Sequence, residues 1–218
     1  MHIFLVNDDG IESVGIHALC RAALDAGHRV SVCAPSAQQS AASQRITLTE
    51  PIYVKEYDMG LPGVQAWAVT GTPTDCVRLG LFNLIRDPVD VVISGINDGH
   101  NAGMAVHYSG TVGAATEASL NHTRAMAVSV HHGADGELYA YIAKLAILTA
   151  EKYVGLQTPP ATILNMNAPL RKPAEVLAPV LASLSTANFK DSYIRRVSPR
   201  SGVYYWMTND YQMEPPEA

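Results

Sequence analysis

Two adjacent carboxylates, Asp8 and Asp9, follow a short apolar run in the stretch HIFLVNDDG. Neighbouring negative charges repel each other, so a chain that places them together needs water or a cation to offset the repulsion. A structural interpretation is that Asp9 caps a following helix and that Gly10 permits a tight turn. A chemical interpretation is a hard divalent cation, because Mg²⁺ and Mn²⁺ favour carboxylate, hydroxyl and amide oxygens.

Neutral oxygens that could complete such a metal site follow two other apolar runs. Ser40 lies in APSAQQSAAS and Asn97 lies in SGINDGHN. The histidines show no spacing typical of a zinc site. Because the carboxyl ends of parallel strands meet at one edge of a sheet, we expect these loops to converge on a single crevice.

A second constellation is the stretch YSGTVGAA, residues 108–115. A structural interpretation is a loop in which Ser109 or Thr111 caps a helix whose small residues allow close packing. A helix N-terminus with free amides and hydroxyls is also an anion site, and opposite a divalent metal it would form a phosphate cradle. The glycine-rich SGINDGHNAG would let the backbone approach a ligand closely, although it could also be only a turn.

Several rival chemistries lack their motifs. A haloacid-dehalogenase phosphatase needs a nucleophilic aspartate two residues before its second aspartate, and the residue there is Asn7, whose amide cannot form an acyl phosphate. A phospho-receiver would carry its acceptor aspartate where this chain has Ser94 and Gly95. Dinucleotide-binding, P-loop and serine-hydrolase motifs do not occur in the sequence.

The elements that must position these residues alternate along the chain. Apolar runs predict strands, and helical spacing of apolar residues predicts helices between them. This order predicts an α/β fold: a doubly wound, mostly parallel Rossmann-like sheet with helices on both faces. The predicted strands cover about 3–6, 29–34, 64–69, 89–94, 125–130 and 162–167, and the predicted helices about 16–24, 74–85, 111–121 and 137–153.

Two segments depart from this rhythm. Residues 43–63 contain the short β-prone runs 46–48 and 52–54 and predict an antiparallel excursion from the sheet. The second segment is the C-terminal part of the chain. We expect a catalytic domain over residues 1–170 and a C-terminal extension over residues 171–218, with a strand at 203–207. An isolated strand or hairpin is marginal alone, so we expect this extension to contribute to an oligomer interface.

Composition narrows the class of partner. A chain of 218 residues with 48% hydrophobic residues can bury a sizeable core. The net charge of -5 and the absence of a basic block argue against binding a nucleic-acid polymer. No apolar run reaches the roughly 18 residues of a membrane span, no signal peptide is recognisable, and the three cysteines do not form a disulfide framework, so we expect a cytoplasmic protein without a membrane partner.

The ordered set NDDG, APSAQQSAAS, GTPTDCV, SGINDGHNAG, YSGTVGAATEA and ILNMNAP resembles the survival protein E (SurE) family of metal-dependent 5′/3′-nucleotidases over about residues 1–205. The resemblance implies a homodimer or homotetramer that uses one Mg²⁺ or Mn²⁺ per subunit to hydrolyse nucleoside 5′- and 3′-monophosphates, and also short polyphosphate. It implies metal ligands at Asp8, Asp9, Ser40 and Asn97, of which Asp8, Asp9 and Asn97 are also catalytic. It implies substrate and phosphate contacts at Asn7, Ser43, Asn101, Ser109, Gly110 and Thr111.

The sequence differs from the family pattern at several positions, and two alternative functions remain. Gln39 and Ala41 stand where the family usually has a basic residue and glycine, and Met104 lies where an acidic residue is common, so substrate contacts are more affected than metal binding. The expected mechanism is metal-assisted hydrolysis, in which an aspartate orients or deprotonates the attacking water. The alternatives are a relative that binds metal and phospho-ligand without turnover, and a phosphatase of phosphosugars.

Overall fold

The computed structural model describes residues 1–189, 192–208 and 213–214. It divides into two compact units, Met1–Asn101 with Val106–Pro179 and Ala102–Ala105 with Val180–Ala218. No helix of the described residues is both long and apolar enough to cross a membrane.

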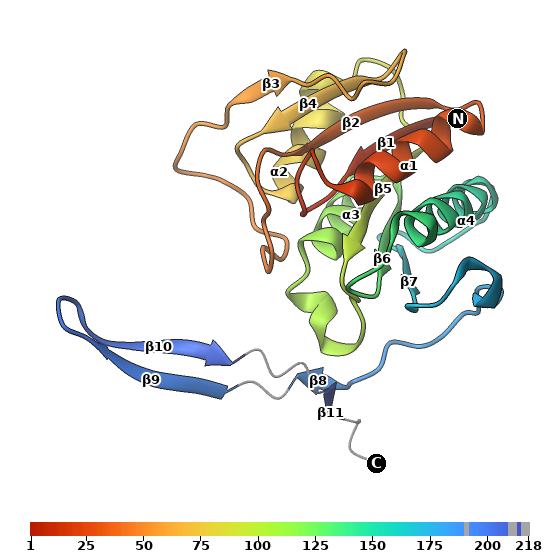
Figure 1. Cartoon of the computed structure of the whole chain (residues 1–218). Helices are drawn as coiled ribbons and strands as arrows, with labels where there is room; N and C mark the ends of the chain where they lie inside the picture. Colours follow the sequence, from red (N-terminus) through yellow and green to blue (C-terminus); the bar gives the residue numbers. More distant parts are fainter. Residues whose placement is uncertain (190–191, 209–212, 215–218) are drawn as a thin grey trace. The chain divides into compact units, whose positions relative to one another are not determined.

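The first unit is built on a seven-stranded sheet in the order β3-β4-β2-β1-β5-β6-β7 (Figure 1). All neighbouring pairs are parallel except β3, which runs antiparallel to β4. This confirms the predicted doubly wound α/β fold. The strands are β1 (His2–Val6), β2 (Arg29–Pro35), β3 (Val54–Glu56), β4 (Gln65–Val69), β5 (Val91–Asp98), β6 (Arg124–Val130) and β7 (Leu164–Ala168).

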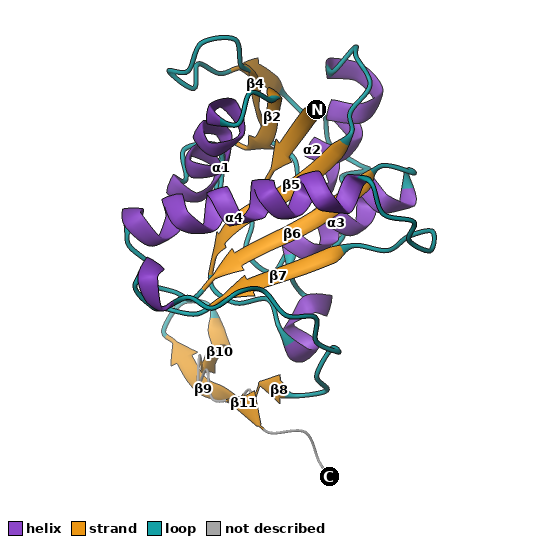
Figure 2. Cartoon of the chain, turned by 90° about the vertical axis from the view of Figure 1, so that its right-hand side faces the viewer, coloured by secondary structure: helices purple, strands orange, loops and turns teal. Residues whose placement is uncertain are grey.

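Helices cover both faces of the sheet, as Figure 2 shows. Alternate residues of β1 point to opposite faces, so Ile3 and Leu5 belong to one core while Phe4 and Val6 belong to the other. The first core packs against α1 (Val14–Asp25) and α4 (Gly136–Val154), and the second against α2 (Pro73–Leu79) and α3 (Gly110–Leu120). The central strand is therefore buried on both sides.

Two predicted elements differ from the structure. The helix predicted over 74–85 ends as an α-helix at Leu79 and continues as a π-helical turn, Gly80–Leu84. Residues 46–48, predicted as β-prone, form a loop, because the Thr47 amide donates to the Asp75 carboxylate at 3.0 Å and is not available to a strand partner. Within residues 43–63 the structure forms one strand, β3.

The second unit contains two antiparallel strand pairs. β9 (Ser192–Ser198) pairs with β10 (Gly202–Thr208), and β8 (Asn188–Phe189) pairs with β11 (Met213–Glu214). β10 confirms the strand predicted at 203–207, whereas β9 was missed, because Arg195 and Arg196 interrupt its apolar pattern. Trp206 and its cross-strand partner Ile194 are exposed. The oligomer interface remains a prediction.

Candidate active site

The two aspartates lie just beyond the carboxyl end of β1, between the ends of β2 and β5. The Asp8 side chain is buried, and its Oδ1 accepts a hydrogen bond from the Thr111 hydroxyl at 2.5 Å. Gly110, the first residue of α3, lies directly against it: a Cβ added there would come within 2.9 Å of Asp8 Cβ and 3.0 Å of Oδ2. Asp8 thus faces the positive end of a helix dipole at close range.

Asp9 connects β1 to its two neighbouring loops. Its Oδ2 accepts a hydrogen bond from the Asp98 backbone amide at 3.1 Å, and its Oδ1 accepts one from the Gln38 side chain at 3.3 Å. Asn97, which precedes Asp98, uses its amide nitrogen to donate to the Gly99 carbonyl at 2.8 Å. This bond leaves the Asn97 side-chain oxygen available as a ligand.

The pKa of both carboxylates is raised above its ordinary value. Burial is the main reason that the pKa of Asp8 rises to about 6, and the neighbouring charge of Asp9 adds to it, while the Thr111 hydrogen bond acts in the opposite direction. Burial also raises the pKa of Asp9, and the Asp98 carboxylate adds to this effect. A cation beside this pair would favour the ionised form of both groups.

The loop after β2 reaches the same place. The Gln39 backbone amide donates to the Asp8 carbonyl at 2.7 Å, and Ser40, exposed, is the next residue. In the part of the chain that the structure describes, no three His, Cys, Asp or Glu side chains cluster as metal ligands. The four predicted ligands are instead two carboxylates, a hydroxyl and an amide oxygen, a set of hard oxygen donors that fits Mg²⁺ or Mn²⁺ better than zinc.

The loop that carries Ser40 has an unusual backbone. Ala41 and Ser43 both adopt positive φ, 55° and 53°. A residue with a Cβ pays about 1–2 kcal/mol in this region, so the surrounding structure must hold the loop in place. The Ser43 amide donates to the Tyr108 carbonyl at 2.9 Å, and the Ser43 hydroxyl donates to the His107 carbonyl at 2.7 Å.

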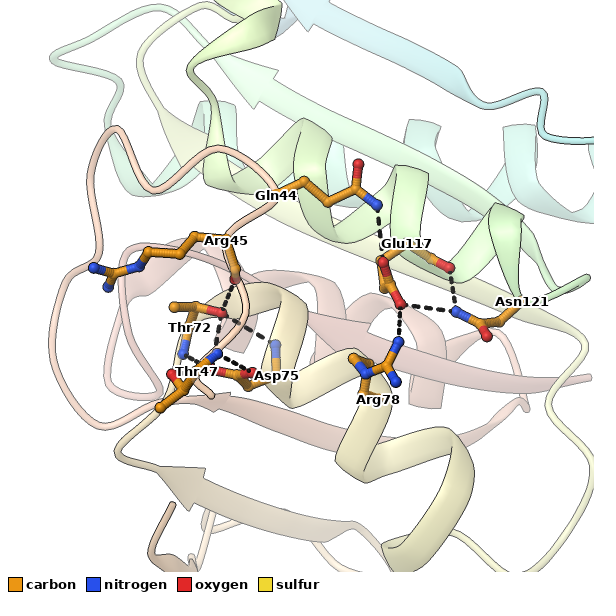
Figure 3. A network of polar contacts seen from close by, with 8 residues as sticks. All are labelled: Gln44, Arg45, Thr47, Thr72, Asp75, Arg78, Glu117 and Asn121. Carbon is orange, nitrogen blue, oxygen red and sulfur yellow. Dashed lines mark hydrogen bonds and ion pairs between the residues drawn. The ribbon is translucent and has the colours of Figure 1, made fainter. Parts of the chain in front are cut away.

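Glu117 of α3 is one anchor of this loop (Figure 3). Its Oε2 accepts a hydrogen bond from the Gln44 side chain at 2.8 Å, and its Oε1 accepts from Arg78 at 2.8 Å and from Asn121 at 3.0 Å. Burial would raise the pKa of Glu117, but these donors together hold it below its ordinary value. The anchor keeps residue 44 against α3.

The N-terminus of α2 is the second anchor. The Thr72 hydroxyl donates to the Arg45 carbonyl at 2.5 Å, and the Thr47 hydroxyl donates to Asp75 Oδ2 at 2.6 Å (Figure 3). Thr72 and Asp75 also form a reciprocal capping box that starts α2. Asp75 therefore takes part in capping α2 and also fixes the loop.

The loop anchors at Gln44 and Glu117 were not predicted from the sequence. The available signal was that Glu117 is the single ionisable residue of α3, a helix otherwise made of small and apolar residues with Thr111, Thr116 and Ser119. An ionisable side chain that is 7% exposed on such a helix requires a polar partner.

The residues predicted to contact the phosphate differ in what their side chains do in the structure. Ser109 is the N-cap of α3, because its hydroxyl accepts from the Val112 amide at 3.1 Å, so its structural interpretation is confirmed. Gly110 and Thr111 contact Asp8, as described above. Asn7 is buried and its amide nitrogen donates to the Gly10 carbonyl and the Ser13 hydroxyl, at 2.9 and 2.7 Å.

Asn101 is held by β6 and β7. Its side chain donates to the Ser129 hydroxyl at 2.9 Å, and its backbone amide donates to Asn167 Oδ1 at 2.8 Å. Its carbonyl accepts from both Asn165 and Asn167, at 2.8 and 3.0 Å. The two asparagines of ILNMNAP therefore shape the loop after β5, and among the described hydrogen bonds none joins Asn101 directly to Asp8 or Asp9.

Fold and site together define a Rossmann-like α/β protein with an acidic pair and a helix N-terminus at the carboxyl edge of its sheet. The model of the family described as survival protein SurE matches residues 3–191. The chain belongs to the SurE family.

Individual relatives agree with this membership. The chain is 42% identical to a 5′-nucleotidase SurE of Solidesulfovibrio magneticus, with 100% of this chain and 83% of that protein covered. It is 39% identical to a 5′-nucleotidase SurE of a Synechococcus strain, over 96% of this chain and 82% of that protein. The crystal structure of the SurE protein from Aquifex aeolicus matches with a TM-score of 0.78 at 32% identity, over 99% of this chain and 84% of that one.

Proposed function

We propose that this protein is a divalent-metal-dependent phosphomonoesterase that hydrolyses nucleoside 5′-monophosphates, and also 3′-monophosphates and short polyphosphate. The observation that carries the proposal is the contact between Asp8 and the start of α3, where the carboxylate, Thr111 and Gly110 meet beside Asp9. The relatives named 5′-nucleotidase SurE support the nucleotide substrate.

Asp8, Asp9, Ser40 and Asn97 would hold one Mg²⁺ or Mn²⁺. When bound, such an ion polarises a phosphate oxygen and lowers the pKa of a coordinated water. Asp9 is the more exposed of the two carboxylates, so it is the better placed to orient the attacking water or receive its proton. The side-chain oxygen of Asn97 and the carboxylate of Asp8 complete the catalytic set.

The start of α3 would bind the phosphate. The backbone amides of its first turn, at Gly110 and Thr111, carry the partial positive charge of the helix N-terminus, which stabilises the negative charge that phosphoryl transfer spreads over the equatorial oxygens. Ser109 shapes this start as the N-cap. Asn7, Ser43 and Asn101 would contribute from the surrounding loops, where their side chains donate to the Gly10 carbonyl, the His107 carbonyl and the Ser129 hydroxyl.

The proposal also includes an oligomeric state. Residues 1–170 would form the catalytic domain, and residues 171–218 would contribute to the interface of a homodimer or homotetramer. The exposed large side chains of β9 and β10, including Tyr205 and Trp206 at 62% and 67% exposure, supply the apolar area that such an interface needs.

The test is phosphate release from AMP in the presence of Mn²⁺. We expect turnover that chelation abolishes and that Asp8→Asn or Asp9→Asn reduces at least 100-fold, an effect of the order seen when groups that stabilise transition-state charge are removed. Nucleotide binding without release under any divalent ion would favour the non-catalytic alternative. A preference for sugar phosphates over AMP would favour the phosphosugar alternative.

A further inference from the structure

The first unit contains a cavity of about 530 Å³ outside the cluster of carboxylates. Its wall is formed by Gln39, by residues 45–53 of the loop after β2, and by residues 70–72 of the turn before α2. Small-molecule sites commonly measure about 300–1,000 Å³, so this cavity has the size of a ligand site.

Two residues of the cavity wall, Gln39 and Thr72, connect to the surroundings of Asp8. Gln39 lines it and donates its backbone amide to the Asp8 carbonyl at 2.7 Å. Thr72 also lines the cavity and precedes Pro73, whose Cγ lies 3.2 Å from the position of a Cβ at Gly110, the residue packed against Asp8. Gln39 and Thr72 therefore connect the wall of this cavity to the residues around Asp8, which makes the cavity the candidate site for the organic group of a phosphate ester held there.

The backbone around the cavity is held by hydrogen bonds, and within the cavity wall the Arg45 side chain donates to Gln39 Oε1 at 3.4 Å. Thr72 and Asp75 hold the backbone of Arg45 and Thr47, and the Tyr53 amide donates to the Thr70 hydroxyl at 2.9 Å. Figure 3 shows the Arg45 side chain extending away from these anchors. Tyr53 is 67% exposed.

The exposed side chains suit a nucleoside. Bases stack on aromatic rings and on guanidinium planes, and Tyr53 and Arg45 offer one of each. The Gln39 side-chain amide and the Thr49 and Thr70 hydroxyls line the same cavity and supply groups for the polar edge of a base or for a ribose.

A second cavity, of about 730 Å³, is less suited to a phosphate ester. Three acidic side chains, Asp135, Glu137 and Glu175, outnumber its two basic ones, Arg171 and Lys172. In the cavity beside Asp8 the charges of Arg45 and Glu50 balance. The excess of negative charge in the second cavity would repel an anionic ligand.

We propose that the 530 Å³ cavity binds the nucleoside part of the substrate, with Tyr53 stacking on the base and Arg45 contacting it as well. This inference rests on the proposed function and deepens it. It makes the enzyme selective for phosphate esters with a large planar organic group over small esters that fill only the phosphate site.

The test compares AMP with methyl phosphate, which has no group that could enter the cavity. We would measure KM and kcat for both in the full chain with Mn²⁺, and in Tyr53→Ala and Arg45→Ala. The matched controls are Leu170→Ala and Lys172→Ala in the second cavity. We expect KM for AMP to rise about tenfold in the first two variants, as the loss of one stacking contact predicts, with kcat/KM for methyl phosphate within about twofold.

Equal losses for AMP and methyl phosphate in Tyr53→Ala would overturn the subsite, as would a rise in KM for AMP confined to the two controls. If the chain released no phosphate from any ester, the proposed function would fail, and calorimetry with AMP would still decide the subsite. Weaker AMP binding in Tyr53→Ala, with Leu170→Ala unchanged, supports it, and equal AMP affinity in both variants overturns it.

Discussion

The Thr111 hydroxyl donates to the Asp8 carboxylate at 2.5 Å, which joins the first turn of α3 to the end of β1. The two residues are 103 positions apart in the sequence, so the contact depends on the whole sheet being correctly assembled. It also places a carboxylate that would bind the cation next to amides that would bind the phosphate, which is the central feature of the proposed mechanism.

Adding a methyl group at Gly110 should displace Asp8. In Gly110→Ala the new Cβ would lie 2.9 Å from Asp8 Cβ and 3.2 Å from Pro73 Cγ, so one of them must move. Because a small misplacement of a catalytic group costs about 100-fold, we expect kcat with AMP to fall by about that factor.

The control for this variant is Gly136→Ala. Gly136 is also the first residue of a helix, α4, and a Cβ there would meet nothing within 4 Å. Circular dichroism should show both variants folded, and Gly136→Ala should keep full activity. If Gly110→Ala were as active as Gly136→Ala, Asp8 would not need its observed position.

The bond between Gln44 and Glu117 should maintain the loop that carries Ser40. Removing it in Gln44→Ala leaves Glu117 paired with Arg78, so the fold should survive while the loop becomes free to relax. We expect Mn²⁺ affinity to fall about three- to tenfold, with a change in melting temperature of only a few degrees. Gln157→Ala, at an exposed loop position, is the matched control. An unchanged Mn²⁺ affinity in Gln44→Ala would show that the bond to Glu117 does not maintain the metal site.

The strained backbone at residue 41 predicts a stabilising substitution. Ala41 has φ 55°, where glycine is not penalised, so Ala41→Gly should raise the free energy of unfolding by about 0.5–1 kcal/mol after the entropy cost of glycine. Ala42→Gly, next to it and outside the left-handed region, should lower that free energy instead. Urea denaturation of both variants checks the prediction, and a loss of stability in both would contradict it.

Asp75 should make stability depend on pH. Burial would raise its pKa, but hydrogen bonds from Thr47 and Thr72 outweigh burial and hold the pKa below its ordinary value of 3.8. A carboxyl whose pKa is lowered by folding stabilises the fold above its unfolded pKa, and this contribution is lost as the pH falls through the folded pKa.

Asp75→Asn should therefore cost about 1–2 kcal/mol at pH 7, and this difference from the unmodified chain should stay constant down to about pH 4 and shrink below it. Urea denaturation across this pH range measures the difference. A gap that widened on acidification would show that the Asp75 carboxylate is not stabilised by its hydrogen bonds.

Much of the fold could be predicted because its signals are local. β1 and β5 are apolar runs, and α1 and α4 have apolar residues at helical spacing. The prediction of a β-prone run at residues 46–48 was wrong although these residues have high β propensity. The Thr47 amide donates to Asp75, which is distant in the sequence, and not to a strand partner. β9 was not predicted because its own composition does not indicate a strand. Its pairing with β10 stabilises it.

The site was predictable where it depends on strand ends. Asp8, Asp9 and Asn97 follow β1 or lie near the end of β5, and parallel topology brings such positions together. The tethering of Asn101 by Asn165 and Asn167 and of Gln44 by Glu117 depends on side-chain packing between loops, which periodicity does not encode.

The proposed metal site can be tested by measuring the binding of Mn²⁺ to the full chain by calorimetry. We expect one ion per chain, with at least 100-fold weaker binding in Asp8→Asn and in Asp9→Asn and unchanged binding in Asp25→Asn, an exposed aspartate at the end of α1. Equal Mn²⁺ affinity in the unmodified chain, Asp8→Asn and Asp9→Asn would show that the two aspartates do not bind the ion.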